Sequence, residues 1–415
     1  MTISIKLVLF LCAIHSLAVE VTGRRQVVII VSIDGFRYDY IKAHNLSKLS
    51  ELQREGTHSE RMFNVFDTNT YPNHQSIATG LYPESHGVIS NEVYDPKYRR
   101  VIKYGADLYE EDDILNEITG NGSYSGVMMW PGGEFPYGKT KDRYESLRNT
   151  KILPTYYQEW DMSIPWEVRI DTIIHWITHP TKPTNLVMLY FEEPDLISHA
   201  FGPESDLVKT RLEDLDRVLR YLCEKINYNN LTDFVNVIVV SDHGMKTVTS
   251  TNIIDLRSSV NISLFNTAAS SPVMHIYPKP GYEDIVFRQL NASASRQPFK
   301  VYQKRDIPER WHIARSRRAP PILALADEGY VFQDFLKKIY YYSITAHQTY
   351  GVHGYDNALD SMHPLFLAWG PLIKRGYEIE PFSAVDIFPL VCKILDLPYH
   401  PVNGTLGIGN QKVKE

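Results

Sequence analysis

The sequence predicts an α/β fold with a doubly wound, mostly parallel central sheet and helices on both faces. Three uninterrupted apolar runs, at residues 27–31, 186–190 and 237–240, are typical of strands that are buried on both faces. Between residues 26 and 398, such runs alternate with stretches of helical periodicity, which favours parallel strands joined by crossover helices. We therefore expect one large domain over residues 26–398 and a C-terminal tail over residues 399–415.

The strongest helical pattern lies at residues 206–223, where apolar side chains recur at spacings of three and four. Its apolar positions are Val208, Leu212, Leu215, Leu219 and Leu222. A second helix is predicted over residues 383–395, with Ser383 as its N-terminal cap. Residues 268–345 interrupt the periodicity with proline, arginine and aromatic residues. We therefore expect an inserted subdomain there, with residues 315–321 as an exposed loop.

The first 18 residues have the pattern of a secretory signal peptide. Lys6 precedes a short apolar stretch, and small residues lead to the expected cleavage after Ala18. No later stretch reaches the roughly 18 apolar residues of a membrane span, and the polar C-terminus shows no lipid-anchor signal. We therefore expect a secreted, extracellular monomer without a membrane anchor. Six glycosylation sequons fit that compartment: Asn45, Asn121, Asn230, Asn261, Asn291 and Asn403.

Charge argues against nucleic acid as a partner, and cysteine content excludes little. The formal net charge is −6 and no basic patch dominates, which argues against a nucleic-acid polymer as a specific partner. Only Cys223 and Cys392 remain after the signal peptide, and both lie in apolar helical patterns. A disulfide between them and two buried free thiols are both compatible with this pattern.

Seven residues with metal-binding side chains fall in five segments, each of which contains a strand end or a tight turn. They are Asp34, Thr70, Asp195, His199, Asp242, His243 and His353. In open α/β sheets, ligands bind beyond the carboxyl ends of the strands, which is where these residues fall. Each residue alone could be a turn former, a helix cap or half of a surface ion pair, but no such role explains all five segments. Two Asp/His sets with one hydroxyl suit a pair of zinc ions about 3.5–4 Å apart, as in phosphoryl displacement.

Thr70 supplies the hydroxyl group of this set. Pro72 restricts the backbone before it, so the residues around Thr70 are predicted to form an extended turn. A threonine hydroxyl alone is a poor nucleophile, and coordination to a divalent metal ion activates it by lowering its pKa. Asn91, in the turn-rich stretch 87–91, is a candidate hydrogen-bond donor to the oxygens that become charged during such a reaction. Its alternative role is that of an ordinary turn residue.

Seven segments along the chain match the motifs of one known enzyme family in order and in spacing. They read SIDGFRYDY, NTYPNHQSIATGLYPESHG, SNEVYDP, MWPGGE, YFEEPDLISHAFGP, SDHGM and VHGYDN. Over residues 27–397 the chain thus resembles the nucleotide pyrophosphatase/phosphodiesterase family of the alkaline phosphatase superfamily. The further matches PERWH at residues 308–312 and ADEGY at residues 326–330 resemble its single-domain branch, the fourth and fifth vertebrate members.

The resemblance implies a role for each site residue. One zinc ion would be bound by Asp34, Thr70, Asp242 and His243, and the other by Asp195, His199 and His353. Thr70 would be the nucleophile and pass through a covalent phosphothreonine diester, while Asn91 would bind a phosphate oxygen. The family stacks a nucleobase between two aromatic side chains, which correspond here to Tyr71 and Trp160. Tyr190 corresponds to a tyrosine that lines the same pocket.

Two departures from the family pattern fall near this pocket. Trp160-Asp161 replaces the usual Tyr-Asn pair, which keeps an aromatic surface but changes its size. Residues 97–125 are shorter than in the family and lack its Pro-Ile-Trp segment. Because this region shapes the nucleotide pocket, we expect the preference for base or phosphate chain to differ.

The expected protein is a secreted, two-zinc phosphodiesterase and pyrophosphatase. It would hydrolyse extracellular nucleotides (ATP, ADP and dinucleoside polyphosphates) to nucleoside 5′-monophosphates. One alternative is a choline phospholipid phosphodiesterase, against which Tyr71, Trp130 and Trp160 argue. Another is a secreted nucleotide-binding protein without turnover, against which the complete ligand set argues. The sulfatases of the superfamily need a modified Cys or Ser within a Cys/Ser-x-Pro-x-Arg motif, and the lack of a cysteine near Thr70 argues against that activity.

Overall fold

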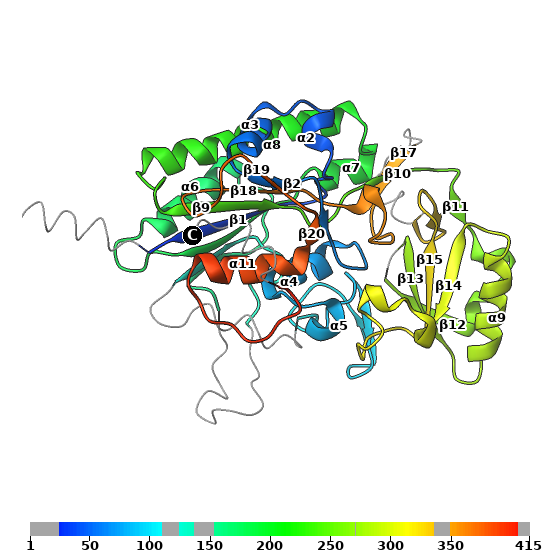
Figure 1. Cartoon of the computed structure of the whole chain (residues 1–415). Coiled ribbons are helices and arrows are strands. Elements are labelled where there is room, and N and C mark those ends of the chain that lie inside the picture. The colour runs from blue at the N-terminus through cyan, green and yellow to red at the C-terminus, as the bar shows by residue number, and fades with distance from the viewer. Residues whose placement is uncertain (1–24, 110–123, 137–152, 270, 336–348, 406–415) are drawn as a thin grey trace, which may run out of the picture.

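The computed structural model describes residues 25–109, 124–136, 153–269, 271–335 and 349–405 (Figure 1). The expected signal peptide over residues 1–18, the sequon at Asn121 and the last ten residues of the tail lie outside the described residues. The five other sequon asparagines are all exposed. No helix among the described residues has both the length and the apolar character to cross a membrane.

The central sheet has eight strands in the order β19-β2-β18-β9-β1-β8-β6-β7. The bounds of these strands, in chain order, are Val27–Ile33 (β1), Thr57–Ser59 (β2), Ser125–Met128 (β6), Tyr156–Gln158 (β7), Leu186–Phe191 (β8), Val235–Val240 (β9), Phe366–Trp369 (β18) and Tyr377–Ile379 (β19). Only β18 runs against its neighbours, β9 and β2. The other pairs are parallel, which confirms the predicted mostly parallel sheet.

The three apolar runs form the centre of this sheet, and helices cover both of its faces. On β1, alternate side chains serve opposite faces: Ile29 and Ile33 contribute to one buried cluster, and Val28 and Ile30 to the other. Figure 1 shows α3 (Ser47–Glu55), α6 (Trp166–Ile177) and α8 (Asp206–Tyr228) on one face, and α4 (Thr70–Thr79) and α11 (Ile387–Ile394) on the other. This two-sided burial is the reason why these strands carry no alternation of apolar and polar residues.

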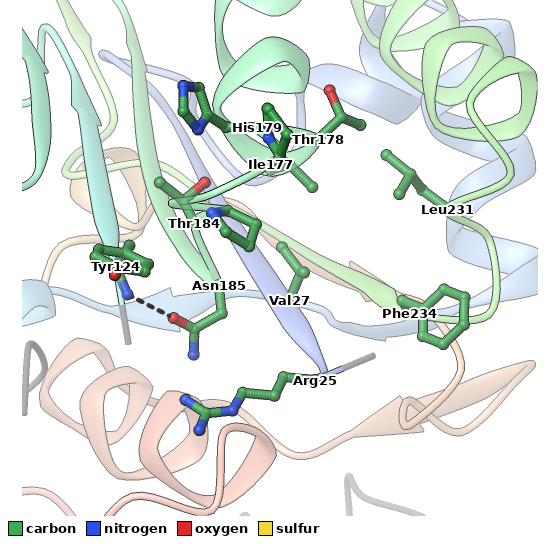
Figure 2. A pocket seen from close by; sticks show the side chains of 12 residues that line it. Arg25, Val27, Tyr124, Ile177, Thr178, His179, Thr184, Asn185, Leu231 and Phe234 are labelled. Atoms are coloured by element: carbon green, nitrogen blue, oxygen red, sulfur yellow. Dashed lines mark hydrogen bonds between the residues drawn. The ribbon is translucent and has the colours of Figure 1, made fainter. Parts of the chain in front are cut away.

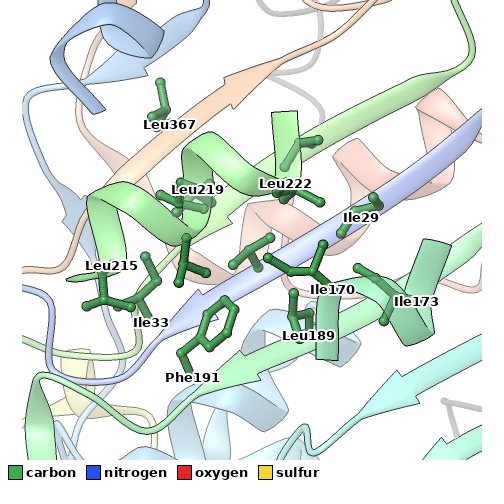
Figure 3. Close-up of a cluster of buried hydrophobic side chains, with 14 of the residues drawn as sticks. Ile29, Ile33, Ile170, Ile173, Leu189, Phe191, Leu215, Leu219, Leu222 and Leu367 are labelled. Carbon is green, nitrogen blue, oxygen red and sulfur yellow. The ribbon is translucent and has the colours of Figure 1, made fainter. Parts of the chain in front are cut away.

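The predicted helix at residues 206–223 is the first part of α8. Leu215, Leu219 and Leu222 point into the cluster that Ile29 and Phe191 share from the sheet (Figure 3). The helix continues to Tyr228 because Ile226 keeps the same spacing and remains buried. Ser205 caps its start by accepting a hydrogen bond from the Val208 amide at 3.3 Å.

The predicted second helix begins later than expected. Residues 384–386 form a single 3₁₀ turn, and the α-helix α11 begins only at Ile387. Ser383 belongs to a short strand, β20 (Phe382–Ser383), and its side chain makes no capping hydrogen bond. Cys392, in α11, and Cys223, in α8, form no disulfide with each other, so that alternative is not realised.

The insertion forms a small antiparallel sheet of its own, in the order β12-β13-β15-β14. Its strands are Phe265–Ala268 (β12), Val273–Pro278 (β13), Phe299–Gln303 (β14) and Ile322–Ala326 (β15). Helix α9 (Glu283–Ala294) buries Val286 and Leu290 against this sheet, at one end of the molecule (Figure 1). The expected subdomain is therefore present, and its first strand begins at Phe265.

Residues 315–321 do not form the exposed loop that we expected. Arg318 is fully buried and donates to the Asp95 carboxylate at 2.8 Å, as well as to the carbonyl groups of Gly87 and Leu108. The arginine-rich composition suggested solvation, but a guanidinium group can be buried when its donors are all used. The loop thereby anchors the insertion to the hairpin of β4 (Val93–Asp95) and β5 (Arg100–Ile102).

A cavity of about 470 Å³ lies at the amino ends of the central strands (Figure 2). Val27, Asn185 and Phe234, which start or directly precede β1, β8 and β9, are among its lining residues. The predicted metal-binding residues follow the opposite ends of these same strands. The cavity and the candidate site therefore lie at opposite edges of the sheet.

We predict that Arg318→Ala lowers the free energy of unfolding by roughly 3 kcal/mol, because it leaves the Asp95 carboxylate buried with fewer partners. Arg317, which also contacts Asp95 at 2.8 Å, limits the loss. Urea unfolding followed by circular dichroism measures the effect. Arg315→Ala, in the same loop but exposed, is the matched control and should change stability by less than about 0.5 kcal/mol. Equal effects of the two substitutions would contradict the anchoring role.

Candidate metal centre

The carboxyl ends of three adjacent parallel strands bring the first ligand candidates together. Asp34 directly follows β1, Asp195 lies four residues after β8 at the start of α7 (Asp195–Phe201), and Asp242 lies two residues after β9. Gly35 makes the first turn possible, since its φ is +69° and a Cβ there would lie 3.0 Å from the Cβ of Asp195. The parallel register alone thus gathers residues that are up to 208 positions apart.

His353 reaches this edge through a second pairing. Strand β10 (Lys246–Thr249) follows His243 and pairs antiparallel with β17 (Thr349–Val352), so that Lys246 lies opposite Val352. The chain therefore returns to the site after the insertion. Thr70 is the first residue of α4, which packs on the face of the central sheet that α11 also covers.

One group of side chains surrounds His243. Its Nε2 atom lies 3.3 Å from Asp34 Oδ1, 3.2 Å from Asp242 Oδ2 and 3.5 Å from the Thr70 hydroxyl oxygen. Asp34, Asp242 and His243 are all buried and place one ligand atom each within 4.8 Å of the others. The four residues that the family resemblance assigns to one ion thus lie together.

A second group adjoins the first. The Nε2 atom of His199 lies 3.3 Å from Asp195 Oδ2 and 3.1 Å from His353 Nε2. Asp195, His353 and His243 form a second set within 4.8 Å, and the rings of His243 and His353 stack with centroids 3.6 Å apart. His243 therefore belongs to both groups, which makes the two candidate ion positions immediate neighbours.

The hydrogen bonds of the three histidines show that these groups suit metal ions. His199, His243 and His353 each direct Nδ1 to a backbone carbonyl oxygen, those of Gly351, Gly244 and Thr68 respectively, at 2.8–2.9 Å. In the neutral rings the proton therefore lies on Nδ1, and the Nε2 lone pairs face one another and the carboxylates. Such a carbonyl partner on the far nitrogen is the usual support of a metal-binding histidine.

The carboxylates give the same indication. Among the described residues, Asp34 Oδ1, Asp195 Oδ1 and Asp242 Oδ2 are buried and accept no hydrogen bond. Burial, together with the charges of Asp242 and Asp195, raises the pKa of Asp34 well above its ordinary value. A buried charge without a partner is costly, and a bound cation removes that cost.

Tyr190 contacts this centre in a way that the sequence did not reveal. Its hydroxyl group donates a hydrogen bond to Asp34 Oδ2, and its ring packs edge-on against His74. Burial and the Asp34 charge raise the pKa of Tyr190, so the hydroxyl keeps its proton for this bond. The substrate-pocket role expected for Tyr190 stays a prediction. The observed hydrogen bond shows that Tyr190 orients Asp34, one of the candidate metal ligands.

The other expected site residues lie around Thr70. Asn91 Oδ1 accepts a hydrogen bond from the Tyr71 amide at 2.9 Å, which leaves the Asn91 Nδ2 group as a donor next to the nucleophile candidate. The Tyr71 ring is partly buried, whereas Trp160 is 52% exposed and makes no ring contact with any described residue. The structure thus places Asn91 and Tyr71 beside Thr70, and it leaves Trp160 at the surface.

We predict that Tyr190→Phe weakens metal retention about tenfold or more, because Asp34 loses a partner that orients it. Competition of the purified protein against a chromophoric chelator measures this. Tyr40→Phe is the matched control, since the Tyr40 hydroxyl is buried and has no hydrogen-bond partner among the described residues. Wild-type metal retention in Tyr190→Phe, with a raised KM for nucleotides, would instead support the substrate-pocket role.

The chain is similar to known proteins over most of its length. A profile of the family described as type I phosphodiesterase / nucleotide pyrophosphatase matches residues 28–356. Human ectonucleotide pyrophosphatase/phosphodiesterase family member 5 is 34% identical, over 98% of this chain and 82% of that protein. Human bis(5′-adenosyl)-triphosphatase is also 34% identical, over 91% and 80% of the two chains.

A solved structure extends the match to the backbone. Murine ectonucleotide pyrophosphatase/phosphodiesterase 5 superposes with a TM-score of 0.84 at 34% identity, over 94% of this chain and all of that chain. A second structure shows an inactive variant of that murine protein in complex with AMP, at the same TM-score. The chain belongs to the type I phosphodiesterase / nucleotide pyrophosphatase family of hydrolases.

Proposed function

We propose that the protein is a secreted two-zinc phosphodiesterase and pyrophosphatase that converts extracellular nucleotides to nucleoside 5′-monophosphates. The observation that carries this proposal is the set of three Nε2 lone pairs and three carboxylates that converge beside the Thr70 hydroxyl. Secretion is supported by the signal-like N-terminal sequence and by the exposure of the five described sequon asparagines.

Zinc fits the donor set better than other common ions. The groups offer imidazole nitrogen and carboxylate oxygen without thiolate, which suits zinc, although manganese or cobalt can occupy such sites. Asp34, Thr70, Asp242 and His243 would hold one ion, and Asp195, His199 and His353 the other. When bound, the ions lower the pKa of the nucleophilic hydroxyl group and polarise the phosphoryl oxygens.

Thr70 and Asn91 have different roles in the proposed reaction. The Thr70 oxygen forms a bond to phosphorus while the bond to the leaving-group oxygen breaks, and the hydroxyl proton passes to solvent. Water next attacks the phosphothreonine, which releases the 5′-monophosphate and restores the threonine hydroxyl. The Asn91 Nδ2 group, which the Tyr71 amide leaves available, donates to the oxygen on which negative charge accumulates.

The substrate class follows from the surroundings of Thr70. The Tyr71 ring lies next to the nucleophile and offers a surface on which a nucleobase can stack, and the exposed Trp160 ring would cover the other face of the base. The names of the relatives support adenine nucleotides, since one is called a bis(5′-adenosyl)-triphosphatase and another was solved with AMP. We therefore include ATP, ADP and diadenosine polyphosphates among the substrates.

Thr70→Ala is predicted to lower kcat by on the order of 10³ or more, because no other hydroxyl takes the position of the nucleophile. Wild-type protein should convert diadenosine triphosphate and ATP to AMP, as measured by chromatography of the products. Thr70→Ser, which keeps a hydroxyl group, is the matched variant and should retain activity.

Two results would reject this part of the proposal. Hydrolysis of a nitrophenyl ester of thymidine monophosphate by Thr70→Ala at the wild-type rate would exclude the covalent step. Cleavage of choline phospholipids by the wild-type protein, without cleavage of nucleotides, would replace the substrate class.

Metal analysis of the purified protein is expected to find two zinc ions per chain, as the two side-chain groups imply. A chelator should abolish activity, and added zinc should restore it. His353→Ala should retain about one ion, because the group around Asp34 and Asp242 stays complete. Full activity in protein without any bound transition metal would overturn the metal assignment.

A further inference from the structure

Tyr104 contacts the proposed base-binding ring, although it lies in the stretch where the chain departs from its family. It follows strand β5 by two residues, and its ring centroid lies 4.8 Å from that of Tyr71, at a tilt of 44°. Tyr71 directly follows the Thr70 nucleophile. The orientation of the Tyr71 ring therefore depends on a residue that no sequence motif indicated.

The Tyr104 hydroxyl group links the same ring to a second segment. It donates a hydrogen bond to the Glu134 carboxylate and accepts one from the Gly132 amide at 3.0 Å. Gly132 and Glu134 belong to the segment after β6, and the neighbouring Phe135 lies 5.3 Å from the Tyr104 ring. Tyr104 thus holds the Tyr71 ring and the Glu134 carboxylate in one fixed arrangement.

Glu134 lies one side chain away from the Tyr71 ring, since Tyr104 contacts both groups. Burial, followed by the charges of Asp34 and Glu134, raises the pKa of Tyr71 to about 12. Burial raises the pKa of Glu134, while the hydrogen bond from Tyr104 favours its ionised form. The ionised carboxylate only accepts hydrogen bonds, and it has sites beyond the one that Tyr104 uses. A base that stacks on Tyr71 would therefore present its edge to an acceptor group.

We propose that Tyr104 is a positioning residue that sets the base preference of the nucleotide site, through the Tyr71 ring and the Glu134 carboxylate. This inference rests on the proposed function. The arrangement favours a base with an exocyclic amino group, such as adenine, over hypoxanthine, which carries an oxygen there. A site built to accept a hydrogen bond disfavours an analogue that offers an acceptor instead.

A purely structural role is the alternative. Tyr104 also contacts Tyr109 and Phe135, so it could simply complete an aromatic cluster. Tyr104 is 38% exposed, however, and among the described residues its hydroxyl bonds only to the segment that holds Glu134. A packing residue would affect every substrate alike, whereas a positioning residue affects only those that carry a base.

The experiment measures kcat and KM for ATP, ITP and bis(4-nitrophenyl) phosphate, which has no base. The variants are Tyr104→Phe, which removes only the hydroxyl, and Tyr104→Ala, which also removes the ring. Tyr98→Phe and Tyr98→Ala are matched controls from the same stretch, since the Tyr98 ring packs against the charged groups of Lys97 and Arg100. Glu134→Gln tests the carboxylate directly.

We expect Tyr104→Phe and Glu134→Gln each to lower the ratio of kcat/KM for ATP over ITP by about threefold to tenfold. Tyr104→Ala should also raise the KM for both nucleotides by about tenfold, with little change in kcat. Activity on the small ester should stay within about twofold in all three variants. The Tyr98 variants should keep the wild-type ratio.

Three results would overturn the inference. The first is equal loss on all three substrates, which indicates packing. The second is an unchanged ATP-to-ITP ratio in Tyr104→Phe, and this variant decides the matter even if Tyr104→Ala fails to fold. The third is a wild-type protein that cleaves the small ester but no nucleotide. That result rejects the proposed function itself. It can be distinguished from a failure of the Tyr104 inference, because the wild-type protein alone reveals it.

Discussion

The structure around the site depends on one constraint: the lone pairs of buried histidine nitrogens and aspartate oxygens face one another, and no proton lies between the two nitrogens. The Nε2 atoms of His199 and His353 lie 3.1 Å apart, and each ring already uses its proton on a backbone carbonyl group. One buried oxygen each of Asp34, Asp195 and Asp242 lies beside them and accepts no hydrogen bond from the part of the chain that the structure describes. Such an arrangement is unfavourable by itself and becomes favourable around cations. The surrounding fold must therefore be stable enough to hold it.

That stability comes from a sheet that is buried on both faces. Strands β1, β8 and β9 are apolar except for Ser32 and Asn236, and they are packed between two layers of helices, so their carboxyl ends have little freedom to move. Ligands attached to such ends are positioned by the sheet and not by flexible loops. The β10–β17 pairing extends the same rigidity to His353, on the far side of a long insertion.

The insertion and the β4–β5 hairpin are also connected to the site by specific contacts. Arg318 ties the insertion to Asp95 at the end of β4, and Tyr104, just after β5, contacts the aromatic ring next to the nucleophile. Tyr104 lies within residues 97–125, where we expected a departure from the family pattern, so this stretch borders the ring next to Thr70. This arrangement allows substrate preference to change while the metal-binding edge of the sheet stays constant.

The sequence alone determined the sheet, the main helix, the insertion and the five segments with metal-binding side chains, because these depend on local periodicity and on ligand chemistry next to strand ends. Tertiary structure decided the rest. Arg318 is buried only because Asp95 and two carbonyl groups meet it from elsewhere in the chain. Ser383 extends a strand instead of capping a helix, since it pairs with β3 (Met62–Phe63). Tyr190 and Tyr104 bond to side chains 156 and 30 residues away, and no local pattern encodes such distant partners.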